Sequence, residues 1–157
     1  MKSLVTYFSA TGITAKVANR LADAVGADIF EIQPLAPYTA ADLDWKDERS
    51  RTTQEMNDPS VRPQIADVRD NMREYDVIFV GFPIWWYVAP RIINTFLESY
   101  DFTGKAIIPF VTSGGSGVEK VIESIQCSCR GASLQKAKLL PVEATLKELA
   151  DWAESYF

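Results

Sequence analysis

The chain contains no histidine and only two cysteines among its 157 residues. Without histidine, neither a Ser-His-Asp triad nor a Cys-His pair can form, and an ordinary zinc enzyme is excluded. The cysteines, Cys127 and Cys129, are separated by one residue, which is a poor spacing for a metal site without further ligands. We therefore interpret them as reduced thiols in a reducing compartment, with a redox or metal role as the minor alternative.

Long apolar runs and an excess of positive charge are also missing. No stretch approaches the ~20 apolar residues that a membrane-spanning helix needs. Residues 1–3 lead directly into the first expected strand, which leaves no room for a signal peptide. The net charge of −5 argues against a nucleic-acid partner, since such a partner requires a basic surface. We expect a cytoplasmic protein whose residues 1–157 form one domain.

Apolar periodicity predicts that strands and helices alternate along the chain. Strands are expected over residues 4–8, 27–32, 75–82, 105–111 and 134–140. Helices are expected from Ile13, around Val68 and Met72, from Pro90, over 118–125, and from Pro141. This alternation predicts an α/β fold with a parallel sheet in the order 2-1-3-4-5 and helices on both faces.

Between the second and third expected strands lies a polar segment of mixed charge, residues 37–63, called the excursion below. Mixed charge predicts an exposed helix or another structured excursion rather than a linker. Within it, Trp45 and Met56 are expected to pack against the body of the protein. Residues 49–51 are interpreted as a solvated charged face rather than as ligand-binding groups.

The turn Ser9–Thr14, between the first strand and its helix, is the first candidate site. A helix start presents free N–H groups and partial positive charge, which favour an anion such as phosphate. Ser9, Thr11 and Thr14 add hydroxyl donors, and Gly12 permits close approach to the backbone. With one glycine and no lysine, the turn matches neither the dinucleotide nor the nucleotide triphosphatase loop. Taken alone, it also fits a capped helix without a ligand.

Two further loops are predicted to meet this turn, because strands one, three and four are neighbours in the expected order. Pro83–Tyr87 holds three adjacent aromatic residues, whose rings stack well on flat conjugated ligands, although at least one is expected to pack under the loop. Thr112–Gly117 offers bare backbone for the edge of a planar ring, or a turn that caps the next helix. Together the loops fit a phosphorylated planar heterocycle, and FMN fits best.

The turn Ser9-Ala10-Thr11-Gly12-Ile13-Thr14 resembles the phosphate loop of the flavodoxin family, Thr/Ser-x-Thr-Gly-x-Thr. The resemblance extends over essentially the whole chain and includes the other two loops. It implies a flavodoxin-like three-layer α/β/α sandwich that transfers electrons through non-covalently bound FMN. The residues that it implies for the cofactor are Ser9, Thr11, Gly12, Ile13 and Thr14 at the phosphate, Pro83, Ile84, Trp85, Trp86 and Tyr87 flanking the isoalloxazine, and Thr112, Ser113, Gly114 and Gly115 along its edge.

The loop after the fourth strand departs from typical flavodoxins, which carry a tyrosine and acidic residues there. Thr112–Gly117 has neither, so the chain looks closer to flavodoxin-like quinone and flavin reductases, in which one ring face stays open. Two functions remain: a carrier that exchanges electrons with a redox partner protein, and an NAD(P)H-dependent reductase of a small quinone-like acceptor. Neither requires a catalytic side chain or a metal. A signalling receiver is excluded because Ser9–Thr11 replaces the acidic cluster that it needs.

Overall fold

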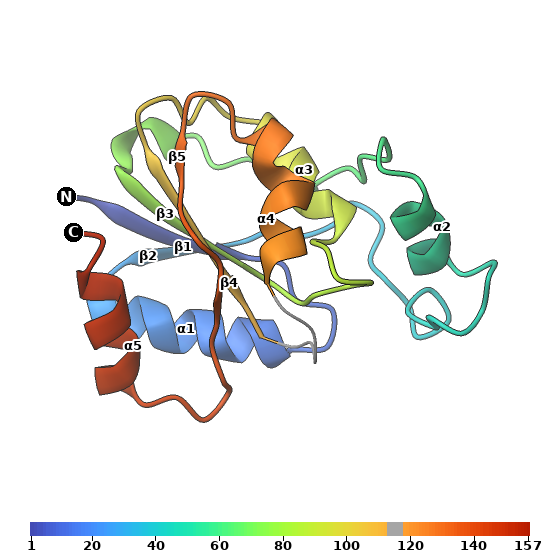
Figure 1. The fold of residues 1–157 in the computed structure, drawn as a ribbon, viewed down its shortest axis with the longest axis horizontal. Coiled ribbons are helices and arrows are strands. Elements are labelled where there is room, and N and C mark those ends of the chain that lie inside the picture. The colour runs from blue at the N-terminus through green and yellow to red at the C-terminus, as the bar shows by residue number, and fades with distance from the viewer. Residues whose placement is uncertain (113–117) are drawn as a thin grey trace.

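A parallel sheet with helices on both faces forms the body of the computed structural model, which describes residues 1–112 and 118–157 (Figure 1). Its strands are β1 (Ser3–Tyr7), β2 (Asp28–Glu31), β3 (Val77–Phe82), β4 (Ala106–Val111), β5 (Ser133–Leu134) and β6 (Lys138–Leu139). Every pairing between these strands is parallel. The order β2-β1-β3-β4-β5 confirms the predicted order 2-1-3-4-5.

Two short strands occupy the edge position where one strand was expected over residues 134–140. Strand β5 pairs with the start of β4, and β6 pairs with its end. The N–H groups of Ser133, Gln135 and Leu140 donate to the carbonyl oxygens of Lys105, Ile107 and Val111, respectively. These three acceptors are alternate, odd-numbered residues, so their carbonyls point to the same edge. Pro109 therefore faces this same edge, where it has no N–H to offer a partner strand. The missing donor accounts for the break between β5 and β6.

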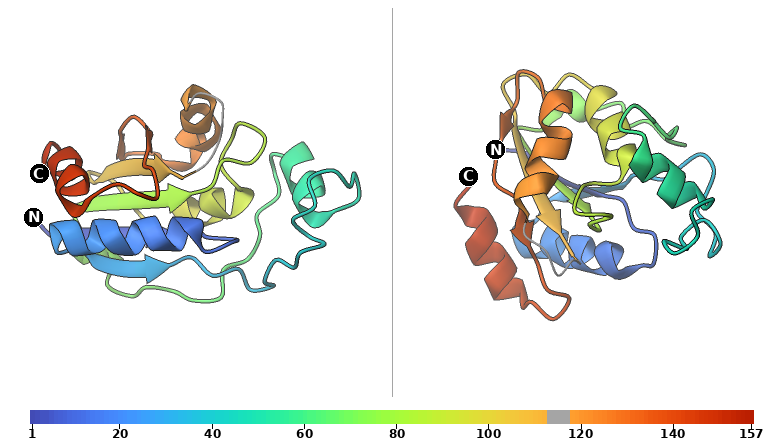
Figure 2. Two further views of the ribbon diagram at one scale, coloured as in Figure 1. Left: turned by 90° about the horizontal axis from the view of Figure 1, so that it is seen from below. Right: turned by 45° about the vertical axis from the view of Figure 1, so that its right-hand side comes forward.

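Helices form two further layers, one on each face of the sheet (Figure 2). Helices α1 (Ile13–Val25) and α5 (Leu146–Glu154) cover one face, and α3 (Arg91–Glu98) and α4 (Glu119–Ile125) cover the other. Alternate residues of β3 serve the two cores: Phe79 packs toward α1 and α5, whereas Ile78 and Val80 pack toward α3 and α4. The whole of β3 is buried, as expected for a central strand covered on both sides.

The connection from β2 to β3 differs from the sequence prediction in its second half. The prediction of a helix around Val68 and Met72 is wrong. In this region the short 3-10 helix η1 (Met72–Glu74) forms instead, and Val68 is 74% exposed. The cause lies just upstream. Leu35 N–H donates to Gln64 O and Ala66 N–H donates to Gln33 O, so this segment runs extended beside the chain that leaves β2.

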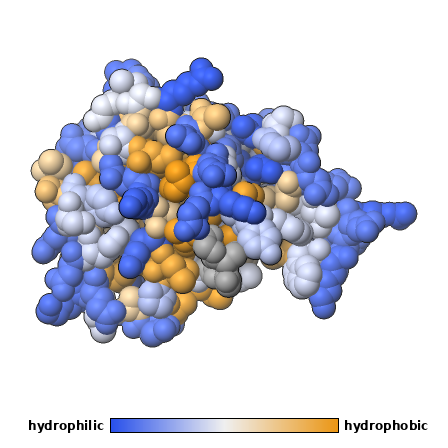
Figure 3. Space-filling model, in the orientation of Figure 1, coloured by the Kyte–Doolittle hydropathy of each residue, from blue (hydrophilic) through white to orange (hydrophobic). Residues whose placement is uncertain are grey.

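The excursion carries helix α2 (Arg51–Asn57) and stands away from the sandwich, with a largely hydrophilic tip in the face that Figure 3 shows. Met56 is buried, which confirms its expected packing role. The same prediction for Trp45 is wrong, because its side chain is 66% exposed. Among the described helices, none is long and apolar enough to cross a membrane.

Candidate functional site

The turn between β1 and α1 leaves the start of the helix open. Gly12 has φ 92°, in the left-handed region that glycine adopts without penalty, and its N–H donates to Ser9 Oγ at 3.0 Å. The helix then begins at Ile13, and Lys16 N–H donates to Gly12 O at 3.2 Å. In the described part of the chain no side chain caps α1, so its first-turn N–H groups are available to an anion.

Thr14 joins this turn to the loop that follows β4. Its buried hydroxyl lies 2.7 Å from Thr112 Oγ1, across 98 positions of sequence. Each hydroxyl carries one hydrogen and one of the two hydrogens makes this bond, so the other remains free for a further acceptor. Ser113, Gly114 and Gly115, which were also predicted here, lie outside the described residues.

A hollow of about 180 Å³, called the loop hollow below, forms where these segments meet. It is lined by Ala10, Thr11, Ile13, Thr14, Leu43, Pro83, Trp85 and Thr112. The structure thus brings residues of the first two predicted loops together with Thr112, the described residue of the third, at the carboxyl ends of β1, β3 and β4. None of these lining residues carries an ionisable side chain, so polarity comes from hydroxyls and from the start of α1.

The loop after β3 forms a tight hairpin that the sequence did not predict. Trp85 N–H donates to Val88 O at 2.9 Å, and Val88 N–H donates to Trp85 O at 3.1 Å. The two residues between them, Trp86 and Tyr87, have φ 48° and 70°. Glycine, asparagine or aspartate usually fill such positions, since the left-handed conformation costs other residues roughly 1–2 kcal/mol each. Strain of this kind persists where the surrounding structure holds it, and it concentrates at functional sites.

The three aromatic side chains of this hairpin have different surroundings. Trp85 packs edge-on against Phe8, at 5.5 Å between ring centroids, and against Tyr38, at 5.4 Å. This confirms that at least one ring packs under the loop. Trp86 and Tyr87 remain 40% and 55% exposed. The hairpin therefore holds one ring as support and presents two rings to solvent.

A second hollow, of about 230 Å³, lies beside the first and is called the tryptophan hollow below. Its lining consists of Trp45, Ile84, Trp85 and Trp86. Trp85 is the residue that it shares with the loop hollow. Trp45 thus lines an aromatic hollow at the surface, whereas the sequence predicted that it packs against the body of the protein.

The flavodoxin family model matches residues 2–156 of the chain. The chain belongs to the flavodoxin family. The crystal structure of a candidate flavoprotein from Bacteroides eggerthii DSM 20697 is 45% identical, covers 98% of this chain and 96% of its own, and superposes with a TM-score of 0.92. A second candidate flavoprotein, from Bacteroides uniformis ATCC 8492, is 48% identical over 98% of this chain and 97% of its own, with a TM-score of 0.91.

A more distant flavoprotein has been solved in complex with FMN, that of Lactobacillus acidophilus NCFM. It is 21% identical to this chain, covers 88% of it and 92% of its own length, and superposes with a TM-score of 0.71, which shows a shared fold. No curated protein matches the chain.

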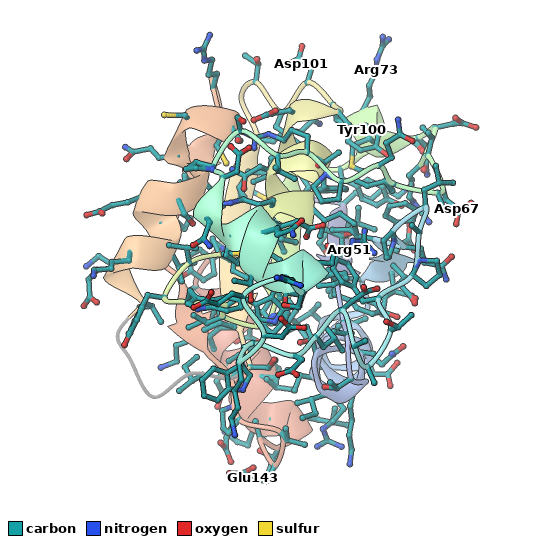
Figure 4. All side chains as sticks on the ribbon, turned by 90° about the vertical axis from the view of Figure 1, so that its right-hand side faces the viewer. Arg51, Asp67, Arg73, Tyr100, Asp101 and Glu143 are labelled. Carbon is teal, nitrogen blue, oxygen red and sulfur yellow. The ribbon has the colours of Figure 1, made fainter. Side chains whose placement is uncertain are left out.

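Tyr38, which packs against Trp85, belongs to a polar cluster on the excursion. Tyr38 Oη donates to Glu55 Oε1 at 2.5 Å, and Arg51 Nε donates to Glu55 Oε2 at 2.9 Å. The Arg51 guanidinium also lies 3.8 Å from the Tyr38 ring centroid, on the α2 face that Figure 4 shows. Burial, followed by the bond to Glu55, raises the pKa of Tyr38 well above its usual value, so Tyr38 stays a donor at neutral pH. The interpretation of residues 49–51 as a solvated charged face is wrong for two of them, because Ser50 is buried at the start of α2 and Arg51 pairs with Glu55 and packs on the Tyr38 ring.

Arg91 fastens the excursion to α3. Its buried guanidinium donates to Glu55 O at 3.2 Å and to Met56 O at 2.9 Å, both in the last turn of α2. A cation at a helix C-terminus satisfies free carbonyls and interacts favourably with the helix dipole. Because α3 follows directly after the aromatic hairpin, the excursion and the hairpin are attached to the same helix.

Larger hollows exist elsewhere in the described part of the chain, but their linings include none of the loop residues above. One of about 360 Å³ lies beside α3 and includes Cys127 and Cys129; another, of about 480 Å³, lies near both termini. Both cysteines are free thiols, and burial raises the pKa of Cys129 to about 11, so its sulfur is protonated at neutral pH. Within the described ranges, no group of three or more His, Cys, Asp or Glu side chains is arranged to hold a metal.

Four site residues escaped the sequence reasoning: Phe8, Tyr38, Leu43 and Trp45. The sequence analysis placed Phe8 in the first strand, where an apolar residue is expected from burial alone, so nothing indicated its contact with Trp85. The other three belong to the excursion, and apolar residues in an otherwise polar segment were the available signal. Of these three, only Trp45 was interpreted from the sequence, as packing against the body. The structure places Trp45 at the tryptophan hollow and Leu43 at the loop hollow.

Proposed function

We propose that the chain is an FMN-binding redox protein that transfers electrons through a non-covalently bound flavin. The observation that carries the proposal is the loop hollow, where the uncapped start of α1, the Thr14–Thr112 pair and Trp85 meet. The L. acidophilus flavoprotein, which binds FMN on the same fold, supports the choice of cofactor.

The residues at the start of α1 fit a phosphate. Their backbone N–H groups have no side-chain cap among the described residues, and Ser9, Thr11 and Thr14 offer hydroxyls beside them. The lining of the loop hollow includes no acidic side chain that would repel an anion. In this proposal Ser9, Thr11, Gly12, Ile13 and Thr14 hold the phosphate through neutral donors and the helix dipole.

The aromatic hairpin fits a flat conjugated ring. Pro83, Ile84, Trp85, Trp86 and Tyr87 would flank the isoalloxazine, and Thr112, with Ser113, Gly114 and Gly115, would follow its edge. When bound, FMN supplies the redox chemistry by taking up and releasing electrons. The protein would bind the phosphate and orient the ring against the indoles.

An NAD(P)H-dependent reductase of quinones or flavins is the second candidate. The exposed rings of Trp86 and Tyr87, together with a loop after β4 that contains no aromatic or acidic residue, favour an open ring face. Steady-state assays with NADH or NADPH and a quinone separate the candidates, because turnover supports the enzyme and reduction solely through a partner reductase supports the carrier. An open face also predicts a less negative reduction potential than that of a low-potential carrier, measurable by spectroelectrochemistry.

The cofactor proposal is tested by purifying the protein and titrating the apoprotein with FMN, following quenching of flavin fluorescence. We expect yellow protein and saturable binding. Thr14→Ala should weaken binding by roughly 1 kcal/mol or more, about fivefold, because a hydrogen bond to a charged group is lost. Thr103→Ala, which changes an exposed threonine outside both hollows, should leave the affinity unchanged. Colourless protein that does not bind added FMN would contradict the proposal.

A further inference from the structure

A hollow of about 360 Å³, called the thiol hollow below, contains both cysteines of the chain. It lies between the end of α3 and the 3-10 helix η2 (Gln126–Ser128), which follows α4. Its lining consists of Leu97, Glu98, Tyr100, Asp101, Phe102, Cys127, Ser128, Cys129 and Arg130. A volume of this order is typical of pockets that hold small molecules. The proposed flavin chemistry uses none of these residues.

The thiol hollow and the loop hollow lie at opposite ends of the sheet. Phe102 comes just before β4, whereas Thr112 comes just after it. The 6 residues of β4 therefore separate the two hollows by roughly 20 Å. Figure 4 shows Tyr100 and Asp101 at one end of the molecule and Glu143, which follows β6, at the other. A molecule in the thiol hollow would contact none of the residues proposed for the flavin.

The two thiols have different surroundings. Cys129 is 6% exposed and belongs to the apolar core, and burial raises its pKa to about 11, so its sulfur stays protonated at neutral pH. Cys127, two residues earlier, is exposed. Access and thiolate character decide which thiol exchanges with a disulfide. Cys127 is therefore the thiol that can react with a molecule from solution, while Cys129 forms part of the wall.

Hydrogen bonds through Ser128 hold the chain between the two cysteines in place. Asn94 Nδ2, on α3, donates to Ser128 Oγ at 3.0 Å, and Ser128 Oγ donates to Glu98 Oε2 at 2.6 Å. The segment that carries Cys127 is thus tied to α3 before any ligand binds. A side chain on an ordered segment loses little conformational freedom when it meets a ligand.

The charge of Glu98 is already paired. Arg62 Nε donates to Glu98 Oε1 at 2.9 Å, and Arg62 Nη2 donates to Oε2 at 3.2 Å. The bonds from Arg62, and then the bond from Ser128, keep the pKa of Glu98 below its usual value, so the carboxylate is charged at neutral pH. Glu98 therefore supports the wall of the hollow and has its partners within the protein.

Two other charged groups of the lining keep free bonding capacity. Asp101 Oδ1 accepts from the Thr103 hydroxyl at 2.6 Å and from the Thr103 N–H at 3.0 Å, and these bonds, the hydroxyl first, keep the pKa of Asp101 below its usual value. Among the described residues, no donor bonds to Asp101 Oδ2 and no acceptor bonds to the Arg130 guanidinium. The hollow thus offers one negative group, one positive group and one accessible thiol.

These three groups match the functional groups of a small amino-acid thiol. A guanidinium such as that of Arg130 pairs with a carboxylate, and a carboxylate such as that of Asp101 accepts from an ammonium group. Cys127 Sγ is the partner for sulfur. The rings of Tyr100 and Phe102, which also line the hollow, provide apolar surface for the short carbon chain of the ligand.

The local charge balance favours a ligand with both charges over an ion of either sign. Arg62 and Arg130 offset Glu98 and Asp101 around the hollow, although the whole chain has a net charge of −5. A strongly anionic thiol would meet two carboxylates, and like charges placed side by side are unfavourable. A purely cationic thiol would leave Arg130 without a partner.

We propose that the thiol hollow is a modification site at which Cys127 forms a mixed disulfide with a small amino-acid thiol. The Cys127 thiolate attacks one sulfur of the symmetric disulfide of that thiol. A new S–S bond forms at Cys127 as the S–S bond of the attacked disulfide breaks, and the departing thiolate takes up the proton that Cys127 has lost. Cys127 is oxidised and the attacked disulfide is reduced. Excess free thiol reverses the step.

The test compares three symmetric disulfides that carry different charges. Each half of cystine has an ammonium and a carboxylate group, each half of cystamine has an ammonium group alone, and bis(2-hydroxyethyl) disulfide is neutral. Intact-protein mass spectrometry follows the modification of the purified full-length protein at neutral pH. Each rate is divided by the rate of the same disulfide with N-acetylcysteine amide, which corrects for intrinsic reactivity. Cystine should exceed the neutral disulfide roughly tenfold after this correction, with cystamine between them, because each exposed ion pair contributes a factor of a few.

Variants of the two charged groups separate recognition from simple exposure. Arg130→Met should slow cystine about threefold and leave cystamine and the neutral disulfide unchanged. Asp101→Asn keeps an acceptor for Thr103, and it should slow cystine and cystamine without affecting the neutral disulfide. Arg49→Met and Asp23→Asn make the same charge changes at exposed positions outside the hollow, and they should leave all three rates unchanged.

Peptide mapping of the modified wild-type protein should find the adduct on Cys127, and Cys127→Ser should abolish it. Three results would overturn the proposal: equal corrected rates for the three disulfides, an adduct on Cys129, or an Arg130→Met variant that slows the neutral disulfide as much as cystine. The inference does not rest on the proposed function. Protein that binds no FMN but still selects cystine through Arg130 would support the modification site and contradict only the flavin proposal.

Discussion

The turn after β1 and the hairpin after β3 both enter the left-handed region of backbone conformation, but with different residues. Gly12 does so at φ 92° without a side-chain penalty, whereas Trp86 and Tyr87 do so at 48° and 70° with large rings attached. The first turn exposes backbone donors to an anion, and the second presents ring faces. A glycine thus marks the left-handed turn in the sequence, whereas the three adjacent aromatic residues mark the second loop without revealing its left-handed backbone.

The largest effect is expected from Gly12→Ala. No atom lies within 4 Å of the added Cβ position, so the cost of roughly 1–2 kcal/mol is backbone strain. The apoprotein can relax by rotating the turn, and FMN must then restore it, so the dissociation constant for FMN should rise about tenfold. Fluorescence titration measures this change.

Gly26→Ala is the matched control at the other end of α1. Gly26 has φ 67° and equally open surroundings, so unfolding in urea should show a similar loss of stability. Its FMN affinity should remain that of the wild type. Equal losses of affinity in both variants would mean that the conformation of the first turn has no special role in binding.

The next effect concerns the contact between Thr14 and Thr112. Thr112→Val keeps the shape of the side chain and removes a hydroxyl, which should lower the free energy of unfolding by about 1 kcal/mol. A double-mutant cycle with Thr14→Val isolates the coupling between the two loops. Additive losses would show that the two hydroxyls do not interact in solution.

Trp86→Gly should change stability in the opposite direction. Glycine relieves the left-handed strain but is more flexible in the unfolded chain, so a net gain of about 0.5–1 kcal/mol is expected. FMN affinity should fall in the same variant because the indole is lost. Tyr87→Gly should give a similar gain, and thermal unfolding of both variants measures it. A loss of stability in both would show that the positive φ values carry no strain.

The smallest effect is expected from Lys120→Met, which removes the cation that α4 places over the Tyr87 ring at 5.3 Å. Exposed cation–π contacts contribute about 0.5 kcal/mol, and methionine preserves much of the aliphatic stem. The loss should therefore be near the limit of urea unfolding measurements. A loss several times larger would mean that α4, rather than its own backbone bonds, holds the hairpin in place.

The order of the sheet could be predicted because buried strands carry continuous apolar runs and each is followed by a helix with its own apolar face. Val77–Phe82 is the clearest case, since all six of its residues are buried. The start of α1 could also be predicted from the sequence, because a glycine flanked by hydroxyl residues indicates a turn with exposed donors without reference to any distant residue. Local patterns therefore suffice for the sheet and for the first turn.

Features that depend on distant partners could not be predicted in this way. The edge strand breaks because Pro109, on its neighbour, lacks a donor, and the helix around Val68 is replaced by pairing between residues 64–66 and 33–35. Trp45 resembles a core residue by composition, and its place beside Trp86 depends on how the whole excursion folds back. None of these partners is adjacent in sequence.

Arg91 has a mechanical consequence for the aromatic surface. Arg91 ties the last turn of α2 to α3, and α3 follows directly after the hairpin. The segments that carry Trp45 and Trp86 are therefore both attached to helix α3. This attachment restricts how far the backbone of the excursion can move relative to the hairpin. A ligand that contacts both segments therefore meets backbone that folding has already ordered, which lowers the entropic cost of binding.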